Sequence, residues 1–240
     1  MKQLALDLSA SAQPTLDNFV AGRNEELAQA LRHLAAGDAR ERFVYLWGEP
    51  GCGRSHLLRS AIAALLARGA AAVYVAVGPG VAIPGEAERA HCVALDDVER
   101  LDPGAQVAAF HLYNALRERG GALIAAGCAP PVQLPLRGDL VTRFAWGLVY
   151  QVMPLTDEDK ARALADRAAA RGFRLPPEVG DFLLSRGRRD MPSLIALVDA
   201  LDRYSLETKR PVTVAMAREL LTLKGDAEPA IRGAGAGGAA

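Results

Sequence analysis

A glycine-rich loop between an expected strand and an expected helix constrains the fold of this sequence more than any other feature. The loop runs from Gly48 to Ser55 (GEPGCGRS) and follows the apolar segment FVYLW at 43–47. A helix is expected through about Leu57 to Ala67. A strand, a glycine-rich turn and a helix in this order predict a loop that binds phosphate. The alternative interpretation is an ordinary glycine-rich turn.

The residue types of the loop fit phosphate binding. Gly48, Gly51 and Gly53 let backbone N–H groups turn toward a phosphate without a Cβ in the way. The N-terminus of the following helix adds a partial positive charge. Ser55 supplies the hydroxyl that holds Mg²⁺ in loops of this form. The loop therefore predicts a site for a nucleotide with its magnesium ion.

Arg54 occupies the position at which such loops usually have lysine. Arginine keeps the positive charge, but its guanidinium is larger, planar and forked. We expect Arg54 to bind the β-phosphate of a nucleotide and to fit a transferring γ-phosphoryl group poorly. The sequence therefore predicts nucleotide binding with weak intrinsic hydrolysis. Cys52, at a variable position of the loop, is interpreted as a small filler rather than a redox group.

A second apolar segment, Val93 to Leu95, ends in Asp96 and Asp97. This is the form of a Walker B strand, in which Asp96 would reach Mg²⁺ through water and Asp97 would orient an attacking water. Two aspartates after a strand are also common in turns. The interpretation depends on the order of the elements, because the segment follows the glycine-rich loop with one expected strand in between.

Strand-like and helical segments alternate over the first two thirds of the chain. The expected strands are Phe43–Trp47, Ala71–Val77, Cys92–Leu95, Leu123–Ala126 and Leu148–Val152, and helices are expected from an N-cap at Asn24, after the loop, and over 107–119. This alternation predicts an α/β fold with a parallel sheet flanked by helices.

The pattern changes after Pro154, where only helices are expected, over about 156–171, 177–186, 190–204 and 213–223. We therefore expect a nucleotide-binding α/β domain at 15–154 and a small all-helical domain at 155–224. Residues 1–14 form an expected N-terminal peptide and linker. The segment 225–240, rich in Gly and Ala, is an expected disordered tail.

Composition excludes several classes of function. Lys and Arg number 28, as do Asp and Glu, whereas a domain that grips DNA phosphates by itself usually has a basic surplus. Cys52, Cys92 and Cys128 form no CxxC pair, so neither a disulfide framework nor a zinc site is supported. The N-terminus lacks the pattern of a secretory signal, and no apolar run is long enough to span a bilayer. A cytoplasmic protein is expected.

Two arginines are candidates for contacts with phosphate. Arg143 stands just before the last expected strand, where an arginine can project from the surface and stabilise charge on a γ-phosphate held by another molecule. The alternative is a surface salt bridge. Arg189, at the start of the 190–204 helix, can fold over a nucleotide, although Arg186 and Arg188 are neighbours that composition does not distinguish from it.

Several stretches resemble the Hda family of DnaA-related AAA+ proteins. They are TLDNFVAGRNEEL (15–27), GRSHLL (53–58), HLYNAL (111–116), DLVTRFAWGLVYQVMPLTDEDK (139–160), RGFRLPPEVGDFLLSR (171–186) and RRDMPSLIALVDALDRYS (188–205). The resemblance covers about residues 3–223 and implies an AAA+ P-loop domain followed by a helical lid domain.

The resemblance implies roles for individual residues. The first stretch would pack on the nucleotide base, which adds Val20 to the nucleotide site, and the loop stretch adds His56. Arg143 would be an arginine finger presented to ATP bound on DnaA. Arg189 would be the sensor-2 arginine that contacts the nucleotide. Cys128 stands where the family usually has aspartate in sensor 1.

The N-terminus resembles the family's short clamp-binding peptide, Gln-Leu-x-Leu-x-Leu. The matching residues are Gln3, Leu4, Leu6 and Leu8, while Ala5 and Asp7 replace the frequent Ser and Pro. The implied partner is the β subunit sliding clamp of DNA polymerase III loaded on DNA. Apart from the resemblance, three leucines near a terminus are more often an arm that packs on the core.

The implied function is regulation of chromosomal replication initiation. In this role the ADP-bound, clamp-associated protein stimulates hydrolysis of ATP on DnaA, touches DNA mainly indirectly and can self-associate. One alternative is a stand-alone ATPase of the helicase-loader type, which Arg54 counts against. Another is a DnaA-like DNA-binding initiator. Against it stand the neutral charge and a chain that ends about where the DNA-binding domain of DnaA would begin.

Overall fold

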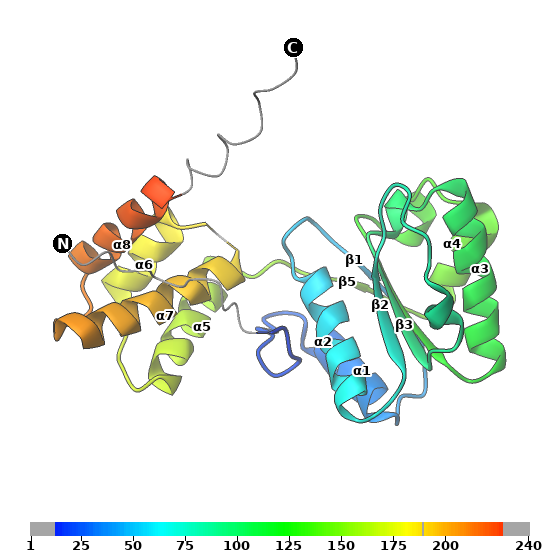
Figure 1. The fold of residues 1–240 in the computed structure, drawn as a ribbon, viewed down its shortest axis with the longest axis horizontal. Helices are drawn as coiled ribbons and strands as arrows, with labels where there is room; N and C mark the ends of the chain where they lie inside the picture. The colour runs from blue at the N-terminus through cyan, green and yellow to red at the C-terminus, as the bar shows by residue number, and fades with distance from the viewer. Residues whose placement is uncertain (1–12, 189, 228–240) are drawn as a thin grey trace, which may run out of the picture. The chain divides into compact units, whose positions relative to one another are not determined.

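The computed structural model describes residues 13–188 and 190–227, which form two compact units (Figure 1). The first unit spans residues 13–155 and contains every strand of the described chain. The second begins at Thr156 and is helical. Within the described residues, no helix is both long enough and apolar enough to cross a membrane.

The first unit is built on a five-stranded parallel sheet in the order β2-β3-β4-β1-β5. The strands are β1 (Phe43–Trp47), β2 (Ala72–Ala76), β3 (Cys92–Asp96), β4 (Ala122–Gly127) and β5 (Leu148–Gln151). All residues of β3 and β4 are buried, as expected for parallel strands covered on both faces. The predicted parallel α/β fold is confirmed.

Helices cover both faces of the sheet (Figure 1). They are α1 (Glu25–Ala36), α2 (Arg54–Ala67), α3 (Pro103–Glu118) and α4 (Gly138–Ala145), with 3-10 turns η1 (Gly85–Glu88), η2 (Val98–Arg100) and η3 (Pro131–Gln133). Side chains alternate along β1, so Val44 and Leu46 join the core under α1 and α2, whereas Tyr45 joins the core under α3 and α4.

The short helix α4 and the start of α2 differ from the sequence-based expectation. No helix was expected at α4, which has only eight residues and buries Leu140 and Phe144 on one face. Helix α2 begins at Arg54, directly after Gly53, rather than near Leu57. Ser55 and His56 therefore lie in the first turn of a helix.

Asn24 precedes α1 as expected, but its side chain does not serve as a helix cap. Its Nδ2 donates to the carbonyl of Met153 at 2.8 Å, and its Oδ1 accepts from the backbone N–H of Met153 at 2.7 Å. Asn24 is buried, so these two bonds tie the start of α1 to the chain just after β5. The local sequence predicts that Asn24 caps α1, but in the structure its side chain bonds to Met153 instead.

A close approach also fixes the chain just before β5. A Cβ at Gly147 would lie 2.0 Å from the carbonyl oxygen of Phe43, at the start of β1. Only glycine lets the backbone between α4 and β5 pass this near to β1. The end of α4 is thereby held against the edge of the sheet.

The second unit consists of α5 (Asp157–Ala170), α6 (Pro177–Arg186), α7 (Met191–Thr208) and α8 (Val214–Ala227). It has its own apolar core, which includes Leu164, Leu183, Leu194, Leu201 and Met216. Thr156 and Asp159 form a capping box at the start of α5.

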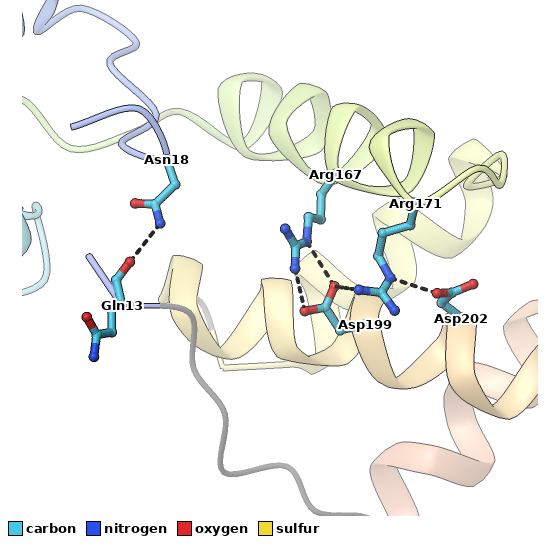
Figure 2. Close-up of polar contacts among 6 residues, drawn as sticks. All are labelled: Gln13, Asn18, Arg167, Arg171, Asp199 and Asp202. Atoms are coloured by element: carbon cyan, nitrogen blue, oxygen red, sulfur yellow. Dashed lines mark hydrogen bonds and ion pairs between the residues drawn. The ribbon is translucent and has the colours of Figure 1, made fainter. Parts of the chain in front are cut away.

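An ion-pair network joins α5 to α7 (Figure 2). Arg167 donates two hydrogen bonds to Asp199, at 2.9 and 2.8 Å, and Arg171 donates to Asp202 at 2.7 Å. Arg171 also lies 3.6 Å from Asp199. The fork of Arg167 matches the carboxylate, so the contact fixes the register of the two helices.

We expect Asn24→Ala to lower the free energy of unfolding of the first unit by about 1–3 kcal/mol, because it removes two part-buried hydrogen bonds to the N–H and C=O of Met153. Asn18 is the matched control, since it is exposed and donates only locally to the carbonyl of Gln13 (Figure 2). Urea denaturation measures both variants. Equal losses for Asn24→Ala and Asn18→Ala would show that the link to Met153 contributes nothing.

Candidate functional site

The predicted phosphate loop and acidic strand end meet at one edge of the sheet. Because β1, β3 and β4 run parallel, the loop after β1, the aspartates after β3 and Cys128 after β4 all follow carboxyl ends. This is the edge at which open α/β sheets bind ligands. The N-terminus of α2 opens at the same place, directly after the loop.

Backbone geometry requires glycine at several positions of the loop. Gly51 and Gly53 have φ of +82° and +107°, in the left-handed region that favours glycine. A Cβ at Gly48 would lie 2.6 Å from the carbonyl oxygen of Val152 and 2.9 Å from Sγ of Cys52. Cys52 is itself buried, and burial raises the pKa of its thiol, which agrees with a filler. The conformation of the loop therefore depends on glycine at these three positions.

Arg54 lies against the acidic strand end. Its Nη2 is 3.8 Å from Oδ1 of Asp97, and within the described residues its buried Nη1 has no hydrogen-bond partner. Asp97 has a left-handed φ of 58° and also lies 4.0 Å from Arg100. Burial, and then the charges of Asp96 and Glu99, raise the pKa of Asp97. The cation of the loop and the second aspartate thus form a weak pair.

Asp96 is 3% exposed and has one satisfied oxygen. Its Oδ2 accepts a 2.7 Å hydrogen bond from the hydroxyl of Tyr74, whereas Oδ1 has no partner in the described part of the chain. Burial, and then the hydrogen bond to Asp96, raise the pKa of Tyr74 to about 12, so the tyrosine stays a donor. Sequence reasoning missed Tyr74, which precedes the site on a neighbouring strand.

Arg54 and Asp96 each have a buried polar atom without a hydrogen-bond partner in the described residues, which fits a site for a nucleotide with magnesium. An anionic phosphate would accept from the free nitrogen of Arg54, and a hydrated Mg²⁺ would contact the free oxygen of Asp96. Ser55 stands in the first turn of α2 as the other predicted magnesium contact. Over residues 13–188 and 190–227 no group of three or more His, Cys, Asp and Glu side chains could hold a metal ion.

The segment before α1 packs on the first turn of α2. The ring of Phe19 lies 5.6 Å from that of His56, and its Cε2 is 3.1 Å from the Cβ position of Gly53. His56 Nε2 lies 3.2 Å from the carbonyl oxygen of Thr15, and burial lowers the pKa of His56. Val20 is half-buried beside this contact. The contact of Val20 and His56 with a nucleotide stays a prediction.

Glu99 brings a carboxylate to the sensor-1 position, which sequence reasoning did not anticipate. Its Oε2 accepts a 3.2 Å hydrogen bond from the backbone N–H of Cys128. Partial burial, followed by the charge of Glu99, raises the pKa of the exposed Cys128 thiol. Cys128 stands where the family that the sequence resembles usually has aspartate, and the carboxylate of Glu99 lies beside it. No local sequence signal links the two positions.

Arg143 is placed by α4 and not by a strand. Its guanidinium carbon lies 4.3 Å from the ring centroid of Trp146, 5.5 Å from that of Phe110 and 5.8 Å from that of Tyr113. Arg143 is half-buried, and the described residues form no salt bridge with it. The alternative of a surface salt bridge is therefore not what the structure shows. The role of Arg143 as a finger stays a prediction.

The remaining predicted residues lie outside the described residues. They are Arg189 of the nucleotide site and the clamp-peptide residues Gln3, Leu4, Leu6 and Leu8.

Comparison with known proteins gives matches for each unit. Residues 157–221 match the family model of the Hda lid domain. Domain III of the Thermotoga maritima replication initiation protein DnaA is similar with a TM-score of 0.68 and 23% identity, over 92% of this chain and 98% of that chain. AMPPCP-bound DnaA from Aquifex aeolicus gives 0.67 and 21%, over 81% and 67%. The Thermotoga maritima RuvB branch migration motor gives 0.63 and 16%, over 88% and 72%.

The parallel sheet, the glycine loop that opens α2 and the helical second unit together define an AAA+ protein. Within that class the helical unit matches the Hda lid domain over residues 157–221, and the fold is similar to that of domain III of DnaA. The predicted order of a P-loop domain followed by a helical lid is confirmed.

We expect Asp96→Asn to weaken magnesium-dependent binding of ADP by about 10–100-fold, as loss of an outer magnesium contact does. Stability without nucleotide should stay equal to or exceed that of the wild type, because the amide removes a buried charge with an unpaired oxygen. Isothermal titration and thermal unfolding test the two parts, with exposed Glu118→Gln as the control. Unchanged ADP affinity in Asp96→Asn would exclude the proposed magnesium contact.

Proposed function

We propose that this chain is a nucleotide-bound regulator of chromosomal replication initiation that stimulates hydrolysis of ATP bound to DnaA. One observation carries the proposal: Arg143 and the phosphate loop belong to opposite edges of the sheet. Arg143 stands just before the amino end of β5, whereas the loop follows the carboxyl end of β1. This arrangement supports a role for Arg143 toward a nucleotide held by another molecule rather than toward one in its own loop.

The chemistry of such an arginine is charge stabilisation in trans. Negative charge that develops on a transferring phosphoryl group is stabilised by a guanidinium from a partner molecule. A planar fork can donate two parallel hydrogen bonds to phosphate oxygens. Arg143 suits this role because aromatic rings, and no carboxylate of the described residues, hold its guanidinium.

The chain's own site is suited to retain a nucleotide rather than to turn it over. Gly48, Gly51 and Gly53 would hold the phosphates, with Arg54 and Ser55 as the charged and hydroxyl contacts. Arg54 pairs with Asp97, the residue expected to orient water, so each is partly engaged by the other. Bound ADP is the proposed working state, and a chain of this kind acts as an activator with weak ATPase activity of its own.

The sliding clamp is the proposed second partner. The Gln3–Leu8 peptide resembles the family's clamp-binding peptide and would place the protein next to DNA, so its contact with DNA is mainly indirect. The Hda lid match supports DnaA as the other partner. The proposed location is the cytoplasm, where both partners act.

We expect Arg143→Ala to bind ADP and the clamp like the wild type and to lose stimulation of ATP hydrolysis on DnaA. An arginine finger supplied in trans contributes about 10³–10⁵ in rate, so the loss should be large. Arg143→Lys should rescue poorly, because a point charge lacks the planar fork. The assay follows ATP preloaded on DnaA, with ADP and DNA-loaded clamp present.

Arg137→Ala is the matched control, since Arg137 precedes the same helix, is exposed and pairs with Asp139. It should stimulate normally. Near-normal stimulation by Arg143→Ala would mean that the finger mechanism has to be abandoned. A turnover of tens per second by the protein alone, in the range typical of enzymes, would instead favour a self-contained ATPase.

The clamp contact is tested by replacing Gln3 and Leu4 together with Ala. Clamp binding measured by surface plasmon resonance should be lost, because each buried leucine of such a peptide contributes roughly 1.5–3 kcal/mol. Melting temperature and ADP affinity should not change. Exposed Leu206→Ala controls for loss of a surface leucine. A lower melting temperature with intact clamp binding would identify the segment as an arm that packs on the core.

A further inference from the structure

Trp146 is an exposed aromatic side chain that carries two cations. It follows the last residue of α4 and is 53% exposed. The guanidinium of Arg143 lies 4.3 Å from its ring centroid and that of Arg117, from α3, lies 4.8 Å away. An exposed tryptophan is uncommon on a protein surface unless it contacts something, and here two arginines use the ring.

Aromatic rings contact the guanidinium of Arg143 and leave its hydrogen-bond donors without partners among the described residues. The buried Nε has no hydrogen-bond partner among the described residues, and none of them forms an ion pair with the guanidinium. Rings of Trp146, Phe110 and Tyr113 lie within 5.8 Å of it instead. A ring attracts the cation through its face, whereas a carboxylate would occupy the fork.

The three rings come from two elements and so restrict where the guanidinium can go. Phe110 and Tyr113 belong to α3, and Trp146 follows α4. Trp146 gives the shortest of the three contacts and is the only one of these rings held by the same short segment as Arg143. Gly147 then fixes that segment against β1, so the position of Trp146 is set by the sheet.

The ring also borders an open, basic cavity. A cavity of about 340 Å³ is lined by Arg40, Arg42, Arg117, Tyr113 and Trp146, among others. Its one carboxylate, that of Glu41, accepts from the backbone N–H groups of Arg42 and Phe43. The three arginines outnumber this carboxylate, so the cavity favours the approach of an anionic group toward Trp146.

We propose that Trp146 is the positioning residue of the Arg143 finger: its ring holds the guanidinium in place and leaves the donors of the fork available to a phosphate of the partner. The inference rests on the proposed function and goes beyond it by naming the residue that prepares the finger. Pre-positioning reduces the conformational freedom that a long side chain must lose when it reaches the transition state.

The test compares Trp146→Phe with Trp146→Leu. Both keep apolar bulk, but only phenylalanine keeps an aromatic face. Hydrolysis of ATP on DnaA is measured against the concentration of each variant. Trp146→Leu should lower the maximal stimulated rate about tenfold, within the range that one cation–π contact supports. Trp146→Phe should restore most of the rate, and the half-saturating concentration should stay near that of the wild type.

Val149→Ala is the matched surface control, since Val149 is an exposed apolar residue of β5, three positions after Trp146 in the chain. It should leave the maximal rate unchanged. If Trp146→Leu instead raises the half-saturating concentration and keeps the maximal rate, Trp146 is an ordinary contact with the partner and the inference is overturned. Equal rates for the leucine and phenylalanine variants overturn it as well.

A second measurement needs no partner. The Arg143 Nε–H resonance, identified by its loss in Arg143→Lys, should be shifted upfield by the rings and exchange slowly with water. Trp146→Leu should remove both properties and Trp146→Phe should keep them; a wild-type signal at the position of a free arginine overturns the inference. If the wild type fails to stimulate hydrolysis, the proposed function falls and this inference falls with it. Normal stimulation by Trp146→Leu overturns the inference alone.

Discussion

Parallel pairing of β1 between β4 and β5 is the interaction on which the rest of the structure depends. It places every strand's carboxyl end at one edge, where the phosphate loop, Asp96 and Cys128 follow, and every amino end at the other. The chain continues this pairing beyond the strands, since Val152 donates to the carbonyl of Trp47 and Leu123 to that of Arg42. The two edges thereby carry two separate chemistries. One carries the proposed nucleotide site, and the other carries Arg143.

The two arginines illustrate how environment decides what the same side chain can do. Arg54 lies beside a carboxylate at the base of a glycine loop, with one nitrogen left for a phosphate. Arg143 lies on aromatic rings, which neutralise nothing and form no competing hydrogen bond. A carboxylate beside a cation competes with a phosphate for its charge and donors, whereas aromatic rings leave the donors unoccupied. This contrast supports the proposal of slow turnover at one edge and activation in trans from the other.

Much of the fold follows from local sequence, because buried parallel strands such as FVYLW are continuous apolar runs and the glycine loop has a fixed context. Helix α4 was missed because it has only eight residues, too short a window for its apolar face to be told from a turn. Asn24 was assigned a cap because its partner, Met153, is far away in the chain. The same limit hid Tyr74, Glu99 and the rings around Arg143, since each contact joins elements that only the folded sheet brings together.

The close approach at Gly147 determines how the segment that carries Trp146 responds to substitutions at this position. Its missing side chain lets the backbone pass Phe43, and any replacement would place a carbon against that carbonyl oxygen. The segment would have to move outward, carrying Trp146 directly and the end of α4 with it. Under the proposed function, a genetic screen for over-replication would then recover substitutions at a residue that has no chemistry of its own, with the phenotype expected for loss of the arginine four positions earlier.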